Sequence, residues 1–176
     1  IGGGAYSIPK ALLTHSSDVI VDVSEIEPSL LWLSKKYFAV EDSSRLRTSA
    51  EDGRRMLRDS AKQYDLIFSD VYYSFFSIPA HCTTVEFFAT AKSKLSKDGV
   101  FMANMIGDLS RRDPSLILSE MRTFQSVFPN SYFFAVYEAG GGTSQNIIFV
   151  GYNSDKQIDF SSKEIVNNQN SLIRTL

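Results

Sequence analysis

The sequence has little of the chemistry that builds a disulfide or a metal centre. Cys82 is the single cysteine, and the two histidines, His15 and His81, lie far apart in the chain. One cysteine cannot form an internal disulfide, and cysteine and histidine are the usual ligands of structural zinc. We therefore expect neither a disulfide framework nor a bound metal.

Long hydrophobic runs and blocks of like charge are also missing. No apolar run approaches the roughly 18 residues of a membrane span, and we expect no signal peptide. The formal net charge is −2, without the basic footprint of a nucleic-acid-binding protein. We expect a cytoplasmic protein that acts on a small molecule, with no nucleic-acid partner and no membrane contact for these residues. The oligomeric state stays open, a homodimer included.

The 176 residues contain a regular alternation of strand and helix patterns. Short apolar runs that end in polar residues predict buried parallel strands at 18–25, 64–70 and 99–105, with a weaker candidate at 45–50. Helical patterns occupy 27–38, 83–95 and 113–128, and in the second of these Thr83 and Glu86 have capping-box spacing. This alternation predicts an α/β fold whose open sheet is covered by helices on both faces.

The C-terminal part breaks the alternation. Two strand-like runs, 131–139 and 146–152, are separated only by GGGTSQ and therefore predict an antiparallel hairpin. A mostly parallel sheet that ends in such a hairpin is typical of the Rossmann-like, methyltransferase-type fold. We expect one nucleoside-binding domain over 1–152 and a polar tail or helix over 153–176. Only Ile1 precedes the first glycines, so we expect the first strand to be truncated here and its apolar residues to be encoded upstream.

Three consecutive glycines, Gly2, Gly3 and Gly4, open the chain. Glycines after a first strand allow a sharp turn and let a ligand approach the backbone closely. The dinucleotide pattern is imperfect because Ser7 occupies the place of its last glycine, and the loop has no lysine or arginine to neutralise a phosphate. A nucleoside without phosphates fits better than NAD or ATP, and a plain tight turn is the alternative.

Acidic residues follow three of the predicted strands. Glu25 stands about 20 residues beyond the glycines, where a carboxylate can accept ribose hydroxyls, and Ile26 offers a flat apolar surface for adenine. Asp52, followed by Gly53, can accept the exocyclic amine of adenine, and Asp70 ends the strand at 64–70. Taken alone, an acid at a strand end more often caps a helix or lies in a solvated turn. Ligands bind at the carboxyl ends of strands in open α/β sheets, so we expect these features to converge on one pocket.

Several motifs resemble the spermidine synthase family, especially its spermidine synthase-like members. In family order they are IGGGAYS, VDVSEIEP, EDGRRML, YDLIFSDVYYSFFSIP and LSKDGVFMANM. The resemblance implies a pocket for S-adenosylmethionine, its decarboxylated form or methylthioadenosine. It also implies that Glu25 is the ribose acid, that Asp52 and Gly53 are the adenine-binding pair, and that Gly2–Gly4 form the glycine loop. Asp70 corresponds to the acid that helps to deprotonate the attacking amine.

The sequence also departs from that family's aminopropyltransferases. Ala5 occupies the position of the loop acid that holds the cofactor's cationic aminopropyl end, and Tyr73 replaces a second acid after Asp70. The family's N-terminal hairpin domain does not occur in these residues. The departures leave open the acceptor amine and the choice between methyl and aminopropyl transfer.

The aromatic stretch after Asp70 suggests a substrate-binding surface. Tyr72 and Tyr73 are candidates for binding an amine beside Asp70, whereas Phe75 and Phe76 could wall a channel or simply pack on the sheet. Our hypothesis is a spermidine synthase-like transferase that moves an aminopropyl or methyl group to an amine. The alternative is a nucleoside-binding module that has lost catalysis, and an NAD-dependent oxidoreductase ranks third.

Overall fold

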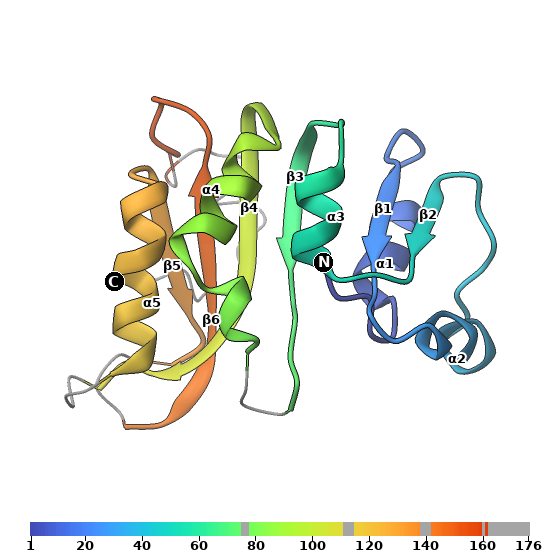
Figure 1. The fold of residues 1–176 in the computed structure, drawn as a ribbon, viewed down its shortest axis with the longest axis horizontal. Coiled ribbons are helices and arrows are strands. Elements are labelled where there is room, and N and C mark those ends of the chain that lie inside the picture. Colours follow the sequence, from blue (N-terminus) through green and yellow to red (C-terminus); the bar gives the residue numbers. More distant parts are fainter. Residues whose placement is uncertain (75–77, 111–114, 138–141, 160, 162–176) are drawn as a thin grey trace. The chain divides into compact units, whose positions relative to one another are not determined.

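The structure is a computed structural model that describes residues 1–74, 78–110, 115–137, 142–159 and 161. The chain divides into two compact units, Ile1–Ala61 and Lys62–Leu176, and each is described by itself (Figure 1). Over these described ranges, no helix has both the length and the apolar character needed to cross a bilayer.

The first unit alternates helix and strand. Its elements are α1 (Ser7–His15), β1 (Val21–Ser24), α2 (Ser29–Tyr37), β2 (Leu46–Ser49) and α3 (Gly53–Asp59). Strands β1 and β2 pair in parallel, from Val21 opposite Leu46 to Ser24 opposite Ser49. Tyr6, Val23 and Val40 form its buried core. The predicted strands at 18–25 and 45–50 are therefore confirmed, although β1 covers only half of the residues expected for it.

Side-chain contacts hold the ends of these elements. The Arg45 guanidinium, just before β2, donates hydrogen bonds to the carbonyl oxygens of Leu13 and Ser16 at distances of 3.0 and 2.7 Å. Cations near the last carbonyls of a helix satisfy groups that have no helical partner. Arg45 thus ties the carboxyl end of α1 to the start of β2.

The second unit is built on a four-stranded sheet. Its elements are β3 (Tyr64–Ser69), the 3₁₀ turn Ala80–Cys82, α4 (Val85–Ser93), β4 (Leu95–Asp108), α5 (Leu116–Val127), β5 (Ser131–Ala135) and β6 (Ser144–Tyr152). The strand order is β3-β4-β6-β5, with β3 and β4 parallel and β6 antiparallel to both of its neighbours. The predicted C-terminal hairpin is confirmed, and with it the α/β class.

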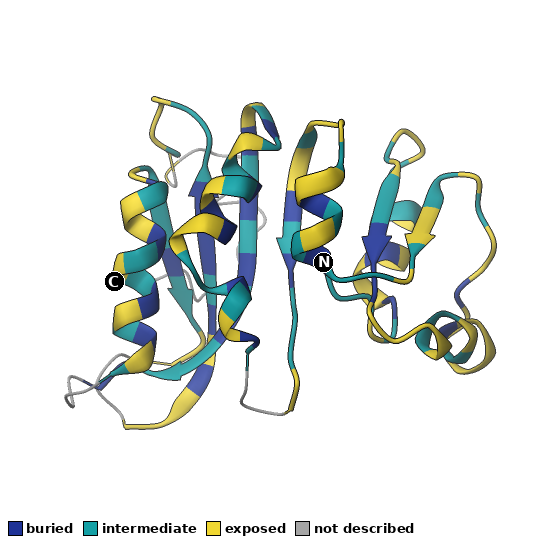
Figure 2. Ribbon diagram, in the orientation of Figure 1, coloured by how far each residue is buried: buried dark blue, intermediate teal, exposed yellow. Residues whose placement is uncertain are grey.

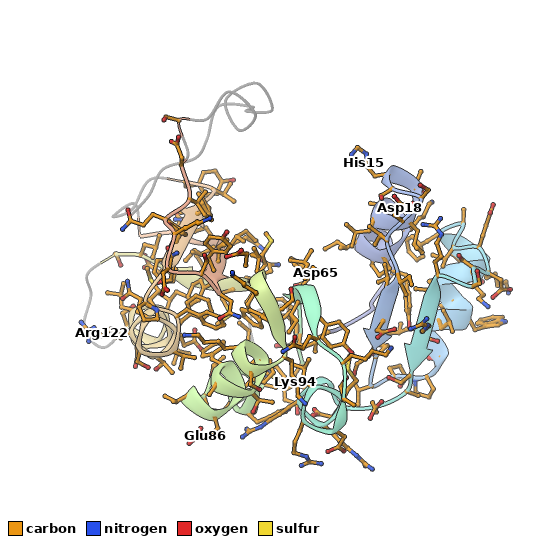
Figure 3. All side chains as sticks on the ribbon, turned by 90° about the horizontal axis from the view of Figure 1, so that it is seen from above. His15, Asp18, Asp65, Glu86, Lys94 and Arg122 are labelled. Carbon is orange, nitrogen blue, oxygen red and sulfur yellow. The ribbon has the colours of Figure 1, made fainter. Side chains whose placement is uncertain are left out.

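Helices α4 and α5 cover one face of this sheet (Figure 1). Burial alternates along β4 (Figure 2). Phe101, Ala103 and Met105 are its buried apolar residues. Seven phenylalanine rings form the core: Phe87, Phe88, Phe101, Phe124, Phe128, Phe133 and Phe149. Glu86 on α4 and Arg122 on α5 point away from the sheet (Figure 3). Asn104 has the opposite parity to the buried positions of β4, so its side chain lies on the other face of the sheet.

The start of α4 differs from the prediction. Its N-cap is Thr84, whose hydroxyl oxygen accepts from the Phe87 N–H at 3.2 Å. Thr83 instead donates its hydroxyl to the Ala80 carbonyl at 3.1 Å, closing the preceding 3₁₀ turn. The capping-box prediction for Thr83 was wrong because that turn takes up its hydroxyl. The helix expected from residue 113 begins at Leu116, and the tail helix at 162–176 lies outside the described residues, as do Phe75 and Phe76.

Candidate active site

Glu25 lies just after β1 and holds the glycine loop. Its Oε2 accepts from the backbone N–H groups of Gly3 at 2.8 Å and Gly4 at 3.0 Å, and its Oε1 accepts from the Glu27 N–H at 2.9 Å. The residue is only 8% exposed. A carboxylate offers about four acceptor positions, so one at Oε1 remains after these three bonds. Glu25 can therefore organise the loop and still accept a ligand hydroxyl.

The glycine loop needs its glycines for conformational reasons as well. Gly2 and Gly4 have φ values of 81° and 51°, in the left-handed region. A Cβ on Gly3 would lie 2.6 Å from the ring of Tyr6, which is 1% exposed. Burial raises the pKa of Tyr6, and the nearby Glu25 charge adds to the effect. The tight-turn interpretation therefore describes part of what these glycines do.

The second predicted acid lies on the same edge of the two-stranded sheet. Because β1 and β2 are parallel, Glu25 and Asp52 follow strands that end at one edge. A hydrogen bond joins the ends of the two strands directly, because the Ser24 hydroxyl at the end of β1 donates to the Glu51 carbonyl just after β2 at 2.7 Å. Asp52 is also the N-cap of α3, where its Oδ1 accepts from the Arg55 N–H at 3.0 Å.

The remaining residues proposed for the nucleoside are placed next to these acids. Gly53 is buried as the first residue of α3, and Ile26 is 65% exposed directly after Glu25. Adenosine needs acceptors for its hydroxyls and amine and an apolar surface for its base. Glu25, Asp52 and Ile26 supply these groups, so the residues present fit an adenosine-containing cofactor.

Asp70 belongs to a separate cluster in the second unit. It follows β3, and its Oδ1 accepts from the Asn104 Nδ2 group at 3.0 Å. Across the described ranges, Oδ2 of Asp70 accepts no hydrogen bond. The Tyr72 hydroxyl donates to the Asn104 carbonyl at 2.7 Å, whereas Tyr73 is 70% exposed. Asp70 and Tyr72 therefore both form hydrogen bonds with Asn104 on β4.

Tyr72, which belongs to this cluster, and the nearby Glu120 have shifted pKa values. Burial raises the pKa of Tyr72, and the charges of Asp70 and Glu120 raise it further, so its hydroxyl stays protonated and can donate. Burial raises the pKa of Glu120 to about 7. Glu120 is 8% exposed on α5, on the same face as the buried Ile117 and Phe124.

Two residues of this neighbourhood, Glu120 and Asn146, were not predicted from the sequence. Glu120 could have been found, since it stands three residues after Ile117 and four before Phe124, on the apolar face of a predicted helix. Asn146, whose Nδ2 group donates to the Asn104 Oδ1 at 2.8 Å, had no such signal. In the described ranges no group of three or more His, Cys, Asp and Glu side chains converges as a metal site would require.

Comparison with known proteins places the chain in a family. Residues 1–161 match the spermine/spermidine synthase domain. The chain belongs to the spermine/spermidine synthase family. The resemblance seen in its motifs is thereby confirmed.

Two curated proteins whose names give different activities are similar to this chain. The polyamine aminopropyltransferase of Vibrio vulnificus is 30% identical over 144 residues, which cover 80% of this chain and 46% of that protein. The N-terminal histidine N-methyltransferase of Emericella nidulans is 31% identical over 157 residues, covering 85% of this chain and 27% of that protein. The chain therefore spans less than half the length of either relative.

Solved structures share the fold. A probable spermidine synthase from Corynebacterium glutamicum superposes with a TM-score of 0.80 at 25% identity, covering 93% of this chain and 58% of that one. Human methyltransferase-like protein 13 in complex with SAH superposes with a TM-score of 0.70 at 23% identity, covering 94% of this chain and 74% of that one. At that identity the second likeness shows the fold alone, and it confirms the methyltransferase-type α/β architecture.

Proposed function

We propose that the protein binds S-adenosylmethionine or its decarboxylated form and transfers an aminopropyl or methyl group to an amine. The observation that carries the proposal is the Asp70 carboxylate, held through Oδ1 by Asn104 at the end of β3. Family membership supports it, because the two relatives are named as an aminopropyltransferase and an N-methyltransferase. Both names describe the transfer of a small alkyl group to a nitrogen-bearing acceptor.

Binding of the nucleoside is the task we assign to the first unit. Glu25 would accept a ribose hydroxyl at Oε1, Asp52 would accept the exocyclic amine of adenine, and Ile26 would cover one face of the base. Methylthioadenosine, the nucleoside left after aminopropyl transfer, would bind the same residues. The sulfonium cofactor supplies the alkyl group and a good leaving group.

Activation of the amine is the task we assign to Asp70. An aliphatic amine is protonated at neutral pH and must lose a proton before its nitrogen can attack carbon. Asp70 Oδ2 attracts the cation and accepts that proton. The amine lone pair then forms the nitrogen–carbon bond as the carbon–sulfur bond breaks, and the electron pair of the broken bond stays on sulfur. The exposed ring of Tyr73 is suited to contact the incoming amine.

Calorimetry and a transfer assay test this function together. The protein is titrated with S-adenosylmethionine, decarboxylated S-adenosylmethionine, methylthioadenosine and NAD, and we expect the first three to bind and NAD not to bind. Transfer is assayed with putrescine and with a lysine-containing peptide as acceptors. Release of methylthioadenosine reports aminopropyl transfer, and release of S-adenosylhomocysteine reports methyl transfer.

Asp70→Asn is the decisive variant of this assay. It should leave nucleoside affinity unchanged and lower turnover by about 10²–10⁴-fold, the usual contribution of a positioned base. Full turnover in Asp70→Asn, or binding of NAD in preference to the sulfonium nucleosides, contradicts the proposal.

A second candidate is a nucleoside-binding module without catalysis. It is favoured by Ala5 and Tyr73, which stand where the family's aminopropyltransferases carry acids. Nucleoside binding without any transfer to either acceptor would support this candidate over the enzyme.

A further inference from the structure

Two side-chain amides lead from the C-terminal hairpin to Asp70. The Asn146 Nδ2 group on β6 donates to the Asn104 Oδ1 on β4 at 2.8 Å, and the Asn104 Nδ2 group donates to the Asp70 Oδ1 at 3.0 Å. In the β4–β6 register Asn104 lies opposite Ile148 and Asn146 lies opposite Ile106. The two asparagines are therefore diagonal neighbours on one face of the sheet.

The direction of these bonds matters because an asparagine amide has one accepting and one donating end. With Asn146 donating to Oδ1, the NH₂ group of Asn104 faces the carboxylate. A flipped Asn104 would place its own oxygen against the Asp70 oxygen and its NH₂ group against the NH₂ group of Asn146. Both contacts would then be mismatched, so Asp70 and Asn146 together favour the orientation in which Asn104 donates to Asp70.

Asn104 also links the segment immediately after β3 to β4. The β3–β4 ladder ends with Ser69 opposite Ala103, one position before Asn104. Beyond that pair, Asp70 contacts the Asn104 side chain and the Tyr72 hydroxyl contacts its carbonyl oxygen, within the residues that the structure describes. The orientation of Asp70 therefore depends on how the Asn104 amide is held.

We infer that Asn146 is a positioning residue of the transferase site. It orients the Asn104 amide, which holds Asp70 by Oδ1 and leaves Oδ2 for the amine. This inference rests on the proposed function of Asp70. The hairpin thereby contributes to a site whose reacting group lies after β3.

Asn146→Asp is the sharpest test, because it keeps the size of the side chain and replaces a donor with an acceptor. The new carboxylate would repel the Asn104 oxygen and so oppose the orientation in which the Asn104 NH₂ group donates to Asp70. Asn146 is exposed, so the substitution buries no charge. Gln157→Glu makes the same amide-to-acid change at another exposed position of the second unit and serves as the control.

The first readout is independent of activity. In nitrogen–proton correlation spectra of the protein, the side-chain NH₂ signals of Asn104 should shift in Asn146→Asp and Asn146→Ala and stay in place in Gln157→Glu. Unchanged Asn104 signals in both Asn146 variants overturn the inference, whatever happens to activity.

The second readout is the division of the effect between kcat and KM, measured at one pH with the acceptor that is active in the transfer assay. We expect Asn146→Asp to lower kcat by about 10-fold, as misplacement of a reacting group does, with no change in KM for the nucleoside. Shifted Asn104 signals with an unchanged kcat would overturn the positioning role.

The outcome for Asp70 keeps the two proposals distinguishable. Shifted Asn104 signals together with full turnover in Asp70→Asn would reject the proposed role of Asp70, while the hydrogen-bonded orientation of Asn104 would stand. If turnover requires Asp70 but Asn146 changes neither readout, the function holds and the inference fails.

Discussion

Glu25 accepts hydrogen bonds from the backbone of Gly3, Gly4 and Glu27, so one carboxylate joins the glycine loop to the chain leaving β1. Hydrogen bonds to a charged acceptor are stronger than neutral ones. Most of the accepting capacity of this carboxylate is used within the protein. A ligand hydroxyl at Oε1 would therefore meet a group that is already held in place.

Replacement of Glu25 by Gln should affect both stability and binding. The amide NH₂ group must face at least one of the three backbone N–H groups, so at least one hydrogen bond is lost. We expect the free energy of unfolding in urea to fall by about 1–3 kcal/mol and the affinity for methylthioadenosine to fall about 10- to 100-fold. Glu41→Gln, at an exposed site, is the control. Unchanged affinity in Glu25→Gln would remove the ribose assignment.

The raised pKa of Glu120 should make the stability of the protein depend on pH. Its folded-state pKa is raised from 4.5 to about 7 by burial, so the folded protein holds the proton more tightly than the unfolded chain. Below pH 4.5 the carboxyl is neutral in both states and costs nothing. As pH rises to about 7 the unfolded chain ionises first, and the free energy of unfolding falls by up to about 3 kcal/mol.

Glu120→Gln removes this dependence. The variant should be more stable than the natural protein by about 2–3 kcal/mol at pH 8 and nearly equal to it at pH 4. Urea unfolding at both pH values measures the difference, and Glu41→Gln should show no comparable trend. A stability difference that is the same at pH 4 and pH 8 would contradict the assignment of a neutral, buried Glu120.

Helix α5 approaches its sheet at two glycines, one on β4 and one on β6. A Cβ on Gly107 would lie 2.5 Å from the Ile117 Cβ, and one on Gly151 would lie 2.5 Å from the Phe128 ring. These contacts are closer than side chains can tolerate. The close packing of α5 on the strands therefore requires a residue without a Cβ at Gly107 and at Gly151.

Gly151→Ala tests this packing of the element. The added methyl group must displace Phe128 or the backbone of β6, and overpacking of this kind costs about 1–3 kcal/mol. Gln125→Ala, on the exposed side of α5, should change stability by less than about 0.5 kcal/mol. Chemical denaturation followed by near-ultraviolet circular dichroism measures both. Equal stability of the two variants would show that Phe128 moves aside without cost.

At the scale of the whole molecule, the proposed tasks are divided between the two units. The residues proposed for the nucleoside belong to Ile1–Ala61, and those proposed for the amine belong to Lys62–Leu176. Substitutions in the first set should change nucleoside affinity, whereas substitutions in the second should change turnover.

The choice of cofactor should depend on Ala5. The neutral side chain does not repel the carboxylate of S-adenosylmethionine, so we expect this cofactor to bind no worse than its decarboxylated form. Ala5→Asp should shift the ratio of the two dissociation constants by about 10-fold toward the decarboxylated form, because the new charge repels the carboxylate and attracts the propylamine. Calorimetry measures the ratio. An equal shift in Ala5→Asn would show that charge is not the cause.

The alternation of strands and helices, the hairpin and the strand-end acids could be predicted from the sequence because they depend on local pattern and on spacing along the chain. The start of α4 was misplaced by one residue. Thr83 and Thr84 are the same type of residue, and only the preceding 3₁₀ turn, which takes up the Thr83 hydroxyl, distinguishes them. Local preference cannot decide between two neighbours with the same hydroxyl.

The sequence by itself therefore determined the fold class, the family and the acids that stand at the ends of strands. Only the tertiary structure decided that Glu25 binds the glycine loop and that Asn146 donates a hydrogen bond to Asn104. Asn104 and Asn146 are 42 residues apart, and they meet because β4 and β6 pair in one register. A shift of that register by one residue would turn either side chain to the other face of the sheet, and the register is set only when the apolar faces of both strands pack together.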